Sequence, residues 1–361
     1  MKIHYIINDI SLEKGGAQRV ARHLHSGLHK QGFYSQIVSL CDPVDGLSNT
    51  IALNNKSLYS WHSFLTVREY ILQYCEKDDV IHVHLFPTLL YAAIAVRLMG
   101  WKGRLVCTEH TTSNRRRSHP LGKIIDRLIY TAYQRIYCIS QGTYDALKAW
   151  IPSQAHKLRI VENGVALSHM SFYERKRKEA LTVVSAGRLH KQKNYETALK
   201  AIRLFIDSNE IEIEYRIAGI GDEEMPLKLL SAELGLEDNV EFCGYIDDVV
   251  AFFEQADIFL MPSLWEGFGL AAVEAMNTGL PVIAGNVAGI REILATLAPC
   301  GVLTSPDSPE EIATAIGVLA DQETRFAYGR EAFRRSLNYS IDSMSQAYAD
   351  EYRQLARNKF S

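Results

Sequence analysis

Two glutamates separated by seven residues flank a glycine-rich turn in the stretch PSLWEGFGLAAVEAM. Glu266 comes directly before Gly267, and Glu274 lies within the helix predicted after Gly269, over residues 270–276. Glycines let backbone N–H groups approach a ligand closely, and the first N–H groups of a helix attract an anion. Carboxylates in such a place are expected to accept hydrogen bonds from hydroxyls rather than to bind the anion. A nucleotide sugar combines hydroxyls with negative charge.

The plainer alternative is that Glu266 is a solvated loop residue and Glu274 a surface position on the helix. The neighbours of Glu274 count against it, because they are all apolar: Ala271, Ala272, Val273, Ala275 and Met276. A carboxylate is costly in such surroundings unless it is paired. The pattern therefore favours a binding role for the two glutamates.

Strands and helices alternate along the chain. Short apolar runs in the first half predict strands at 3–7, 36–40, 80–83, 104–108, 136–139 and 158–161, with helical patterns between them. In the second half, one strand ends at Ala186 and another covers 258–261, with a further strand opening at Pro281. This alternation predicts an α/β fold with parallel sheets, in which ligands bind at the carboxyl ends of strands. Arg188 and Lys193 follow the strand that ends at Ala186, so two cations stand at such an end.

The stretch PSLWEGFGLAAVEAMNTGLPVIA resembles the Glu, seven residues, Glu motif of retaining glycosyltransferases of GT-B fold in family 4, which use nucleotide-diphosphate sugars. The resemblance covers about residues 1–357. It implies two Rossmann-like domains whose parallel sheets face a cleft, and a C-terminal helix that crosses back to the first domain. The expected domains are an acceptor-binding domain at 1–170, completed by about 341–361, and a nucleotide-sugar-binding domain at 171–340.

The resemblance also implies roles for individual residues. Arg188 and Lys193 would hold the donor diphosphate and neutralise the leaving group. Glu266 would bind hydroxyls of the donor sugar, and Glu274 the ribose. His110, after a strand of the first domain, would face the donor sugar and completes the catalytic set. The remaining donor-binding residues implied are Gly16, Gly187, Tyr245, Gly267, Phe268, Gly269 and Leu270.

Some of these positions have ordinary explanations as well. Gly15 and Gly16 could form a flexible loop, but their place after the first strand resembles the family's glycine-rich loop. Tyr245 could be a surface aromatic residue. His82 and His84 fit either packing or a ligand cleft, and no third ligand accompanies them at metal-binding spacing. We therefore expect no metal requirement and no cofactor, the nucleotide sugar being a substrate.

A basic segment, SNRRRSHPLGKIIDRLIYTAY, contains Arg115, Arg116, Arg117 and Lys123 together with apolar residues at helical spacing. It could be a solvated loop beside a core-facing helix. The alternative is a patch that contacts an anionic membrane or grips a lipid-linked acceptor. Residues 1–170 hold 20 Lys and Arg against 12 Asp and Glu, and the rest of the chain holds 19 against 30, which agrees with the second interpretation.

The composition of the chain bears on its compartment and on its partners. The six cysteines show no C-x-x-C pair, which predicts reduced thiols in a cytoplasmic protein. If the basic patch contacts lipid, the protein would lie at the inner face of the cytoplasmic membrane. The N-terminal apolar run is short and continues into a polar loop, so it fits a first strand better than a signal peptide, and no apolar run approaches the roughly 18 residues of a spanning helix. Nucleic acid is not an expected partner, because the chain lacks a recognition motif and its second half is acidic.

The resemblance implies transfer of a sugar from a nucleotide-diphosphate sugar, with UDP as the commonest nucleotide of such enzymes, to a hydroxyl of a glycan or lipid-linked oligosaccharide used for surface polysaccharide, with retention at the anomeric carbon. Three other functions stay open. A non-hydrolysing nucleotide-sugar epimerase would convert the donor without an acceptor. A glycosidase would need Glu266 and Glu274 aimed at one bond and gives no use for Arg188 or Lys193. A non-catalytic subunit would bind nucleotide sugar without turnover.

Overall fold

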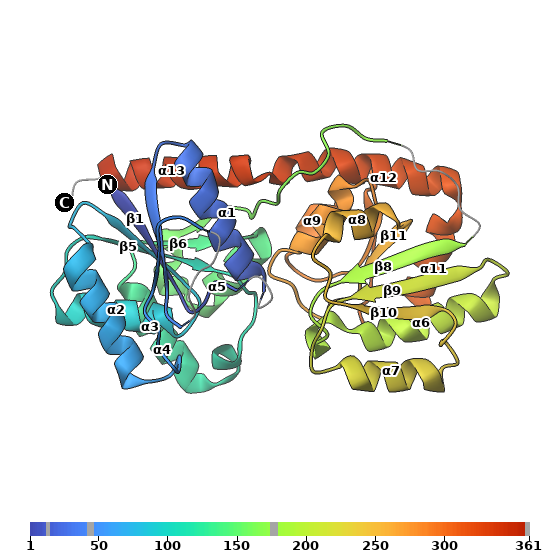
Figure 1. Cartoon of the computed structure of the whole chain (residues 1–361), viewed down its shortest axis with the longest axis horizontal. Helices are drawn as coiled ribbons and strands as arrows, with labels where there is room; N and C mark the ends of the chain where they lie inside the picture. Colours follow the sequence, from blue (N-terminus) through green and yellow to red (C-terminus); the bar gives the residue numbers. More distant parts are fainter. Residues whose placement is uncertain (12–14, 42–46, 174–179, 358–361) are drawn as a thin grey trace. The chain divides into compact units, whose positions relative to one another are not determined.

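The computed structural model describes residues 1–361 except 12–14, 42–46, 174–179 and 358–361. The chain divides into two compact units, drawn in Figure 1. Unit 1 comprises Met1–Gly164 and Ile341–Ser361, and unit 2 comprises Val165–Ser340. The first boundary lies six residues before the one expected at 170, and the second lies at the expected place.

Unit 1 is built on a seven-stranded sheet in the order β3-β2-β1-β4-β5-β6-β7. Every neighbouring pair is parallel. The strands are β1 (Lys2–Ile7), β2 (Tyr34–Ser39), β3 (Thr50–Ala52), β4 (Val80–His84), β5 (Arg104–Glu109), β6 (Arg135–Cys138) and β7 (Leu158–Ile160). All carboxyl ends of the strands therefore lie along one edge of this sheet, which is the edge that receives the loops after them.

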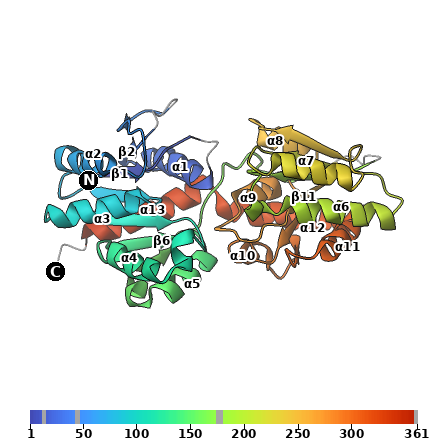
Figure 2. The same ribbon diagram turned by 90° about the horizontal axis from the view of Figure 1, so that it is seen from below.

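Helices cover both faces of the unit 1 sheet. On one face α1 (Gly16–Lys30) packs against the last helix, α13 (Ile341–Arg357). Figures 1 and 2 show α2, α3 and α4 on the opposite face, where α3 packs between the other two. The bounds of these three helices are α2 (Trp61–Tyr74), α3 (Thr88–Leu98) and α4 (Pro120–Thr131). The other helical elements between β5 and β7 are the 3-10 turn η2 (Arg115–Ser118), α5 (Gln141–Trp150) and the 3-10 turn η3 (Pro152–Lys157).

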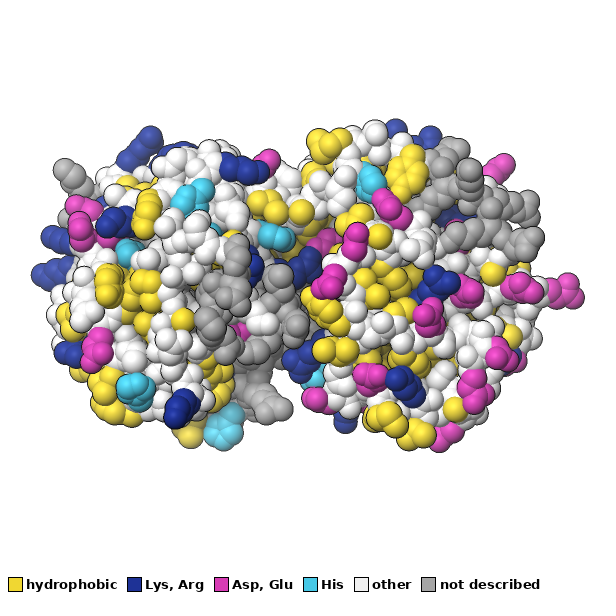
Figure 3. All heavy atoms as spheres, viewed as in Figure 1, with side chains coloured by type: hydrophobic (Ala, Val, Ile, Leu, Met, Phe, Trp, Pro, Cys, Tyr) yellow, Lys and Arg dark blue, Asp and Glu magenta, His cyan; other side chains and the backbone are white. Residues whose placement is uncertain are grey.

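Unit 2 repeats this plan with a six-stranded parallel sheet in the order β10-β9-β8-β11-β12-β13. Its strands are β8 (Leu181–Ala186), β9 (Ile213–Ala218), β10 (Val240–Gly244), β11 (Ile258–Met261), β12 (Val282–Gly285) and β13 (Gly301–Thr304). Its helices are α6 (Tyr195–Ser208), α7 (Glu224–Glu233), α8 (Val249–Glu254), α9 (Leu270–Asn277), α10 (Arg291–Leu294), α11 (Pro309–Ala320) and α12 (Gln322–Ser336), with 3-10 turns η4 (Lys191–Lys193) and η5 (Leu337–Tyr339). Acidic side chains are spread over the face of unit 2 seen in Figure 3.

The two parallel sheets confirm the predicted α/β class, and the predicted strands are present with bounds shifted by one or two residues. The helix predicted over 270–276 is α9, and the strand predicted to open at Pro281 is β12. Two strands were not predicted: β3, which has only three residues, all of them half-buried, and the four-residue β13. Residues 174–179, near the start of the domain expected at 171–340, lie outside the described residues. None of the helices in the described part of the chain has the length and apolar character needed to cross a membrane.

Helix α13 is tied into unit 1 by buried polar contacts as well as by apolar packing. The Tyr352 hydroxyl lies 2.6 Å from His82 Nδ1 and 3.3 Å from the Tyr5 hydroxyl. One turn earlier, the Tyr348 hydroxyl lies 3.0 Å from Thr108 Oγ1, which in turn is 2.7 Å from His82 Nε2. Both ring nitrogens of the fully buried His82 therefore have partners, one of them supplied by the end of the chain.

Substituting Tyr352→Phe should destabilise unit 1 by about 1–3 kcal/mol, because it leaves a buried nitrogen of His82 without its hydroxyl partner. The free energy of unfolding, measured by urea denaturation of wild type and variant, checks this. Tyr59→Phe is the matched control, since Tyr59 is 71% exposed and should change stability by less than about 0.5 kcal/mol. Equal stability of the two variants would contradict the structural role of the Tyr352 hydroxyl.

Candidate active site

The loop between β11 and α9 brings a carboxylate and a cation together in unit 2. Glu266 in this loop is only 7% exposed. Its Oε1 forms an ion pair with Lys193 Nζ and accepts a hydrogen bond of 3.1 Å from Ser263 Oγ. A buried carboxylate is stable only with such partners. Two residues that lie 73 positions apart in the sequence, both predicted as catalytic, are thus in direct contact.

Hydrogen bonds of the residues on either side of Lys193 hold its side chain next to Glu266. The Gln192 side chain donates to the Trp265 carbonyl at 2.8 Å, and the Leu264 N–H donates to the Gln192 carbonyl at 2.9 Å. Asn194 adopts the left-handed conformation at φ +55° and donates to the Pro262 carbonyl at 3.2 Å. The turn η4 is therefore fastened to the loop after β11 on both sides of Lys193, which holds its side chain next to Glu266.

Glycines allow the loop to lie where it does. Gly269 is the N-cap of α9 with φ +104°, a conformation that side chains other than glycine rarely adopt. Gly289 in the loop after β12 has φ +96°, and a Cβ on it would come within 2.7 Å of the Glu266 carbonyl oxygen. No side-chain hydrogen bond caps α9, and the Ala272 N–H donates to the Gly269 carbonyl at 3.0 Å, so the earlier N–H groups, those of Leu270 and Ala271, point out from the start of the helix. They supply the positive end of the helix dipole beside Glu266 and Lys193.

The end of β8 adds the second predicted cation. Gly187 closes this strand, and the Arg188 side chain that follows it is exposed. The Lys193 side chain passes the same glycine, since a Cβ on Gly187 would come within 3.2 Å of Lys193 Cε. Arg188 is therefore available to an anion close to the place where Lys193 and Glu266 meet.

The other predicted donor-binding residues of unit 2 differ in their surroundings. Glu274 is buried within α9, and Leu270 is half-buried at its start. The Phe268 side chain is buried and packs edge-on against Tyr339, with ring centroids 5.4 Å apart. The ring of Phe268 therefore serves packing, and the residue can offer a ligand only its backbone. Tyr245 is exposed in the loop after β10.

In unit 1, three histidines lie in a row at the carboxyl ends of β4 and β5. The rings of His82 and His84 stack with centroids 4.4 Å apart, and His84 Nδ1 lies 2.9 Å from His110 Nε2. His82 and His84 are fully buried, and His110 is half-buried at the strand end. The partly accessible His110 therefore rests on a buried histidine that can donate to it or accept from it.

Burial keeps this histidine row neutral. It lowers the pKa of His110 to about 3, and it lowers the pKa values of His82 and His84 well below the ordinary value. A neutral His110 can donate a hydrogen bond to a substrate hydroxyl or accept one from it near pH 7, but it does not carry charge there.

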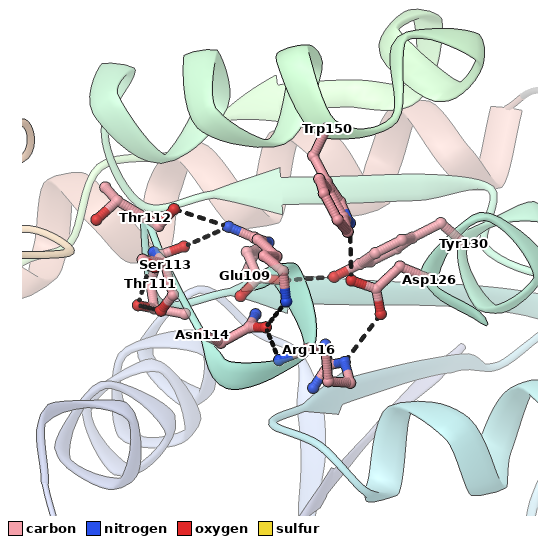
Figure 4. A network of polar contacts seen from close by, with 10 residues as sticks. Glu109, Thr111, Thr112, Ser113, Asn114, Arg116, Asp126, Tyr130 and Trp150 are labelled. Atoms are coloured by element: carbon pink, nitrogen blue, oxygen red, sulfur yellow. Dashed lines mark hydrogen bonds and ion pairs between the residues drawn. The ribbon is translucent and has the colours of Figure 1, made fainter. Parts of the chain in front are cut away.

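The basic segment in unit 1 differs from the prediction. The Arg117 side chain is only 8% exposed and pairs with Glu109, with Arg117 NH2 3.2 Å from Glu109 Oε2. It also donates to the Thr112 carbonyl at 3.0 Å, while the Tyr130 hydroxyl donates to Glu109 (Figure 4). Arg117 is therefore not part of an exposed patch, because the buried Glu109 needs a countercharge.

Arg116 is also held inside unit 1. Its Nε donates to the fully buried Asp126 at 2.9 Å, and its guanidinium lies 4.2 Å from the Phe86 ring centroid. Of the four residues predicted as a patch, only Lys123 has a described, exposed side chain, which lies over the Trp150 ring at 5.5 Å. The side chain of Arg115 lies outside the described residues.

The remaining expectations concern the glycine loop and metal binding. Gly15 is the N-cap of α1 and Gly16, exposed, is its first residue, so both lie where an anion would meet a helix start. In the part of the chain that the structure describes, no group of three or more His, Cys, Asp or Glu side chains is placed to hold a metal ion.

The sequence analysis missed the residues that position the site. Ser263, Gln192 and Gly289 contact Glu266 or its loop, yet each is an unremarkable polar or small residue in its local context. One signal for these contacts was present in the sequence: Gly289, in the stretch VAGI, which comes after the strand that follows the two glutamates. A glycine in the loop after the next strand can mark a place where the backbone comes close to such a motif.

Substituting His110→Gln should flatten the dependence of unit 1 stability on pH. The folded pKa of about 3 is below the unfolded value, so the unfolded chain binds a proton that the folded chain does not between about pH 3 and 6.5. The contribution of His110 to stability is therefore fully present above that window, and it is lost as the pH decreases through the window. Removing His110 should reduce the slope by up to about 1.4 kcal/mol per pH unit.

Urea denaturation between pH 7 and pH 5 measures this slope. His62→Gln is the control, because His62 is exposed on α2. A slope that His110→Gln leaves unchanged would show that His110 is protonated as readily in the folded protein as in the unfolded chain.

Two family models match the chain. The model described as Glycosyltransferase Family 4 matches residues 14–169, and the one described as Glycosyl transferases group 1 matches residues 169–335. The first match falls in unit 1 and the second in unit 2, apart from five residues at their junction.

Curated relatives agree with these models at low identity. The chain is 29% identical over 243 residues to an uncharacterized 41.2 kDa protein in the cps region of Klebsiella pneumoniae, covering 60% of this chain and 63% of that protein. It is 28% identical to the UDP-Gal:alpha-D-GlcNAc-diphosphoundecaprenol alpha-1,3-galactosyltransferase of Escherichia coli, covering 59% of each. These matches thus span about three fifths of each relative. An uncharacterized glycosyltransferase of Haemophilus influenzae is 25% identical over 96% of this chain and 98% of its own length.

Solved structures share the fold along the whole chain. Sucrose-phosphate synthase of Thermosynechococcus elongatus matches with a TM-score of 0.82 at 20% identity, covering 98% of this chain and 99% of that one. HepE of Anabaena matches with a TM-score of 0.83 at 18% identity, covering 98% and 100%. The chain therefore has the GT-B fold of these structures, and it is similar to glycosyltransferases in two parts, a family 4 match over residues 14–169 and a group 1 match over residues 169–335.

Proposed function

We propose that the chain is a hexosyltransferase that moves a sugar from a nucleotide-diphosphate sugar to a hydroxyl of a glycan or lipid-linked acceptor. The observation that carries this proposal is the contact between Lys193 and Glu266 at the start of α9. A cation and free helix N–H groups suit a diphosphate, and the adjacent carboxylate suits sugar hydroxyls. A nucleotide sugar presents these two kinds of group side by side.

We propose further that transfer proceeds with retention at the anomeric carbon. The bond between the anomeric carbon and the diphosphate oxygen breaks, and the acceptor oxygen forms its new bond on the same face of the sugar. The proton of the acceptor hydroxyl passes to the leaving phosphate oxygen. Arg188, Lys193 and the first N–H groups of α9 stabilise the negative charge on that phosphate as the bond breaks.

This mechanism assigns the leaving-group charge to protein groups, so we propose that no metal is required. Lys193 is fixed by its ion pair with Glu266 and by the contacts of its neighbours, which lowers the cost of arranging charge in the transition state. Arg188 is exposed at the strand end and free to move toward the diphosphate. His110 of unit 1, neutral near pH 7, would offer a hydrogen bond to a substrate hydroxyl.

UDP is the nucleotide that the relatives favour. The E. coli relative uses UDP-galactose and a diphosphoundecaprenol acceptor by its name, and the HepE structure contains UDP and glucose. Other relatives are named for amylovoran synthesis in Erwinia amylovora and for lipopolysaccharide core synthesis in Rhizobium meliloti. We therefore propose a UDP-sugar donor and an acceptor used for surface polysaccharide, with a lipid-linked diphosphate as the first class to test.

Substituting Lys193→Ala or Glu266→Gln should lower the rate of sugar transfer about 100-fold or more, because each removes a group that contacts the donor where charge or hydroxyls are held. Lys200→Ala is the matched control, since Lys200 lies on the following helix, is exposed and pairs only with Glu196 among its described charged neighbours. Thermal melting of all three variants separates a lost contact from a lost fold. Full activity in both site variants, with unchanged melting, would refute the site.

A thermal-shift screen with UDP-, GDP-, ADP- and TDP-sugars should raise the melting temperature with UDP-sugars most, because a ligand that binds only the folded state stabilises it. The shift should disappear in Lys193→Ala. Incubating the donor with the enzyme alone tests the epimerase alternative, since conversion of the sugar without an acceptor is not expected. The absence of a shift with every nucleotide sugar would count against donor binding.

A further inference from the structure

His84 is a fully buried histidine that contacts His110 directly. Its Nδ1 lies 2.9 Å from His110 Nε2, and the two ring centroids are 5.2 Å apart. Burial keeps both rings neutral near pH 7, so each ring carries one N–H and one bare nitrogen. One of the two facing nitrogens therefore donates a hydrogen bond and the other accepts it, and this choice fixes the tautomer of both rings.

The second nitrogen of His84 indicates which of the two rings donates. His84 Nε2 is buried and has no hydrogen-bond partner among the residues that the structure describes. In protein interiors, an N–H group without an acceptor is rarer than an acceptor without a donor. The single proton of His84 therefore belongs on Nδ1, which donates to His110 Nε2.

This hydrogen bond determines what His110 can offer to a ligand. Because His110 Nε2 accepts from His84, the single proton of the His110 ring is on Nδ1. His110 Nδ1 forms no hydrogen bond with any described residue, and the side chain is only half-buried after the end of β5. The group of His110 that is available to a substrate is therefore an N–H donor and not a lone pair.

Neighbouring side chains hold the His84 ring in this orientation. Its face stacks on His82, with ring centroids 4.4 Å apart and ring planes 28° apart. His82 is itself bonded at both nitrogens, to the Tyr352 hydroxyl of α13 at 2.6 Å and to Thr108 Oγ1 of β5 at 2.7 Å. Turning the His84 ring over would place Cδ2 instead of Nδ1 against His110 and would lose the hydrogen bond. A line of contacts thus runs from the last helix to His110.

The register of the sheet explains why His84 and His110 meet. His84, the last residue of β4, pairs with Thr108 of β5. Side chains two positions apart share one face of a strand, so His110 lies next along the face that carries Thr108. Glu109, between them, belongs to the opposite face, where it pairs with Arg117 at 3.2 Å. The contact between the two histidines therefore follows from the parallel pairing of β4 with β5.

We propose that His84 is a positioning residue that holds His110 in the Nδ1–H tautomer, so that His110 donates a hydrogen bond to a hydroxyl oxygen of the substrate. The proposal rests on the proposed function and adds the direction of this hydrogen bond. In this tautomer, the one lone pair of the His110 ring is occupied by His84. His110 is therefore not the base of the reaction, which agrees with transfer of the acceptor proton to the leaving phosphate oxygen.

Nitrogen NMR of the whole chain with isotope-labelled histidine tests the tautomer in the absence of donor and acceptor. Long-range proton–nitrogen correlation spectra at neutral pH distinguish protonated from bare ring nitrogens. The signals of His110 are assigned by their loss in His110→Gln. Wild type should show a protonated Nδ1 and a bare Nε2 for His110. The opposite pattern, or a mixture of the two tautomers, would overturn the proposal whether or not the chain transfers sugar.

Two substitutions of His84 separate the hydrogen bond from packing. An Asn side chain places an N–H donor near the position of His84 Nδ1, whereas a Leu side chain fills the space without a donor. His84→Leu should lose the single tautomer of His110 and lower kcat/KM for transfer about tenfold. His84→Asn should keep the protonated Nδ1 of His110 and stay within about threefold of wild type, because the donor is restored. If His84 served packing alone, Leu would be the milder change.

His25→Leu is the matched control, because His25 on α1 is also buried, at 2% exposed, and bonds to Ser35 Oγ at 2.8 Å instead of to His110. It should leave the nitrogen signals of His110 as in wild type, and thermal melting of all variants separates a lost contact from a lost fold. An unchanged His110 tautomer in His84→Leu, or slower transfer by His84→Asn than by His84→Leu, would contradict the positioning role. If neither variant folds, the tautomer of His110 in wild type decides.

Discussion

Both sheets of this protein are parallel throughout, and that constraint determines where its chemistry can lie. Parallel strands need a helical crossover after each strand, so every loop that follows a strand emerges at the same edge. In unit 2 this rule places Arg188 after β8 and Glu266 after β11, two strands that are neighbours in the sheet. In unit 1 it places His84 and His110 at the ends of the neighbouring strands β4 and β5.

Within that frame, polar contacts rather than apolar packing decide the orientation of the chemical groups. Glu266 and Glu109 are both buried carboxylates, and each is paired with a cation, Lys193 in one unit and Arg117 in the other. Removing one partner of such a pair is costly, because the remaining charge is left uncompensated in a poor solvent. The two pairs differ in access: the Arg117 side chain is 8% exposed, whereas that of Lys193 is 19% exposed and lies next to Gly187, which the exposed Arg188 follows. Only the second pair is placed to exchange its partner for a ligand.

The sequence predicted the fold well because its signals are local. Apolar runs of four to six residues separated by helical periodicity fix strands, helices and their parallel order. The short β3 was not predicted, because its three half-buried residues form no such apolar run. Lys193 and Glu266 could be expected as site residues from the resemblance, but the contacts of Gln192 and Asn194 that bring them together could not, since they join segments about seventy residues apart.

The basic segment shows where local reasoning fails and why. Charge alone made Arg116 and Arg117 look exposed, but the buried acids Asp126 and Glu109 require countercharges, and these two arginines supply them. The periodicity of α4 correctly indicated an amphipathic helix, yet it could not tell which apolar face the core would cover. The core covers Ile129 and Tyr130 and leaves Leu121, Ile124 and Leu128 outside. Burial of the acid and exposure of these apolar side chains therefore have one cause: α4 is rotated so that its polar contacts with η2 and α5 point inward.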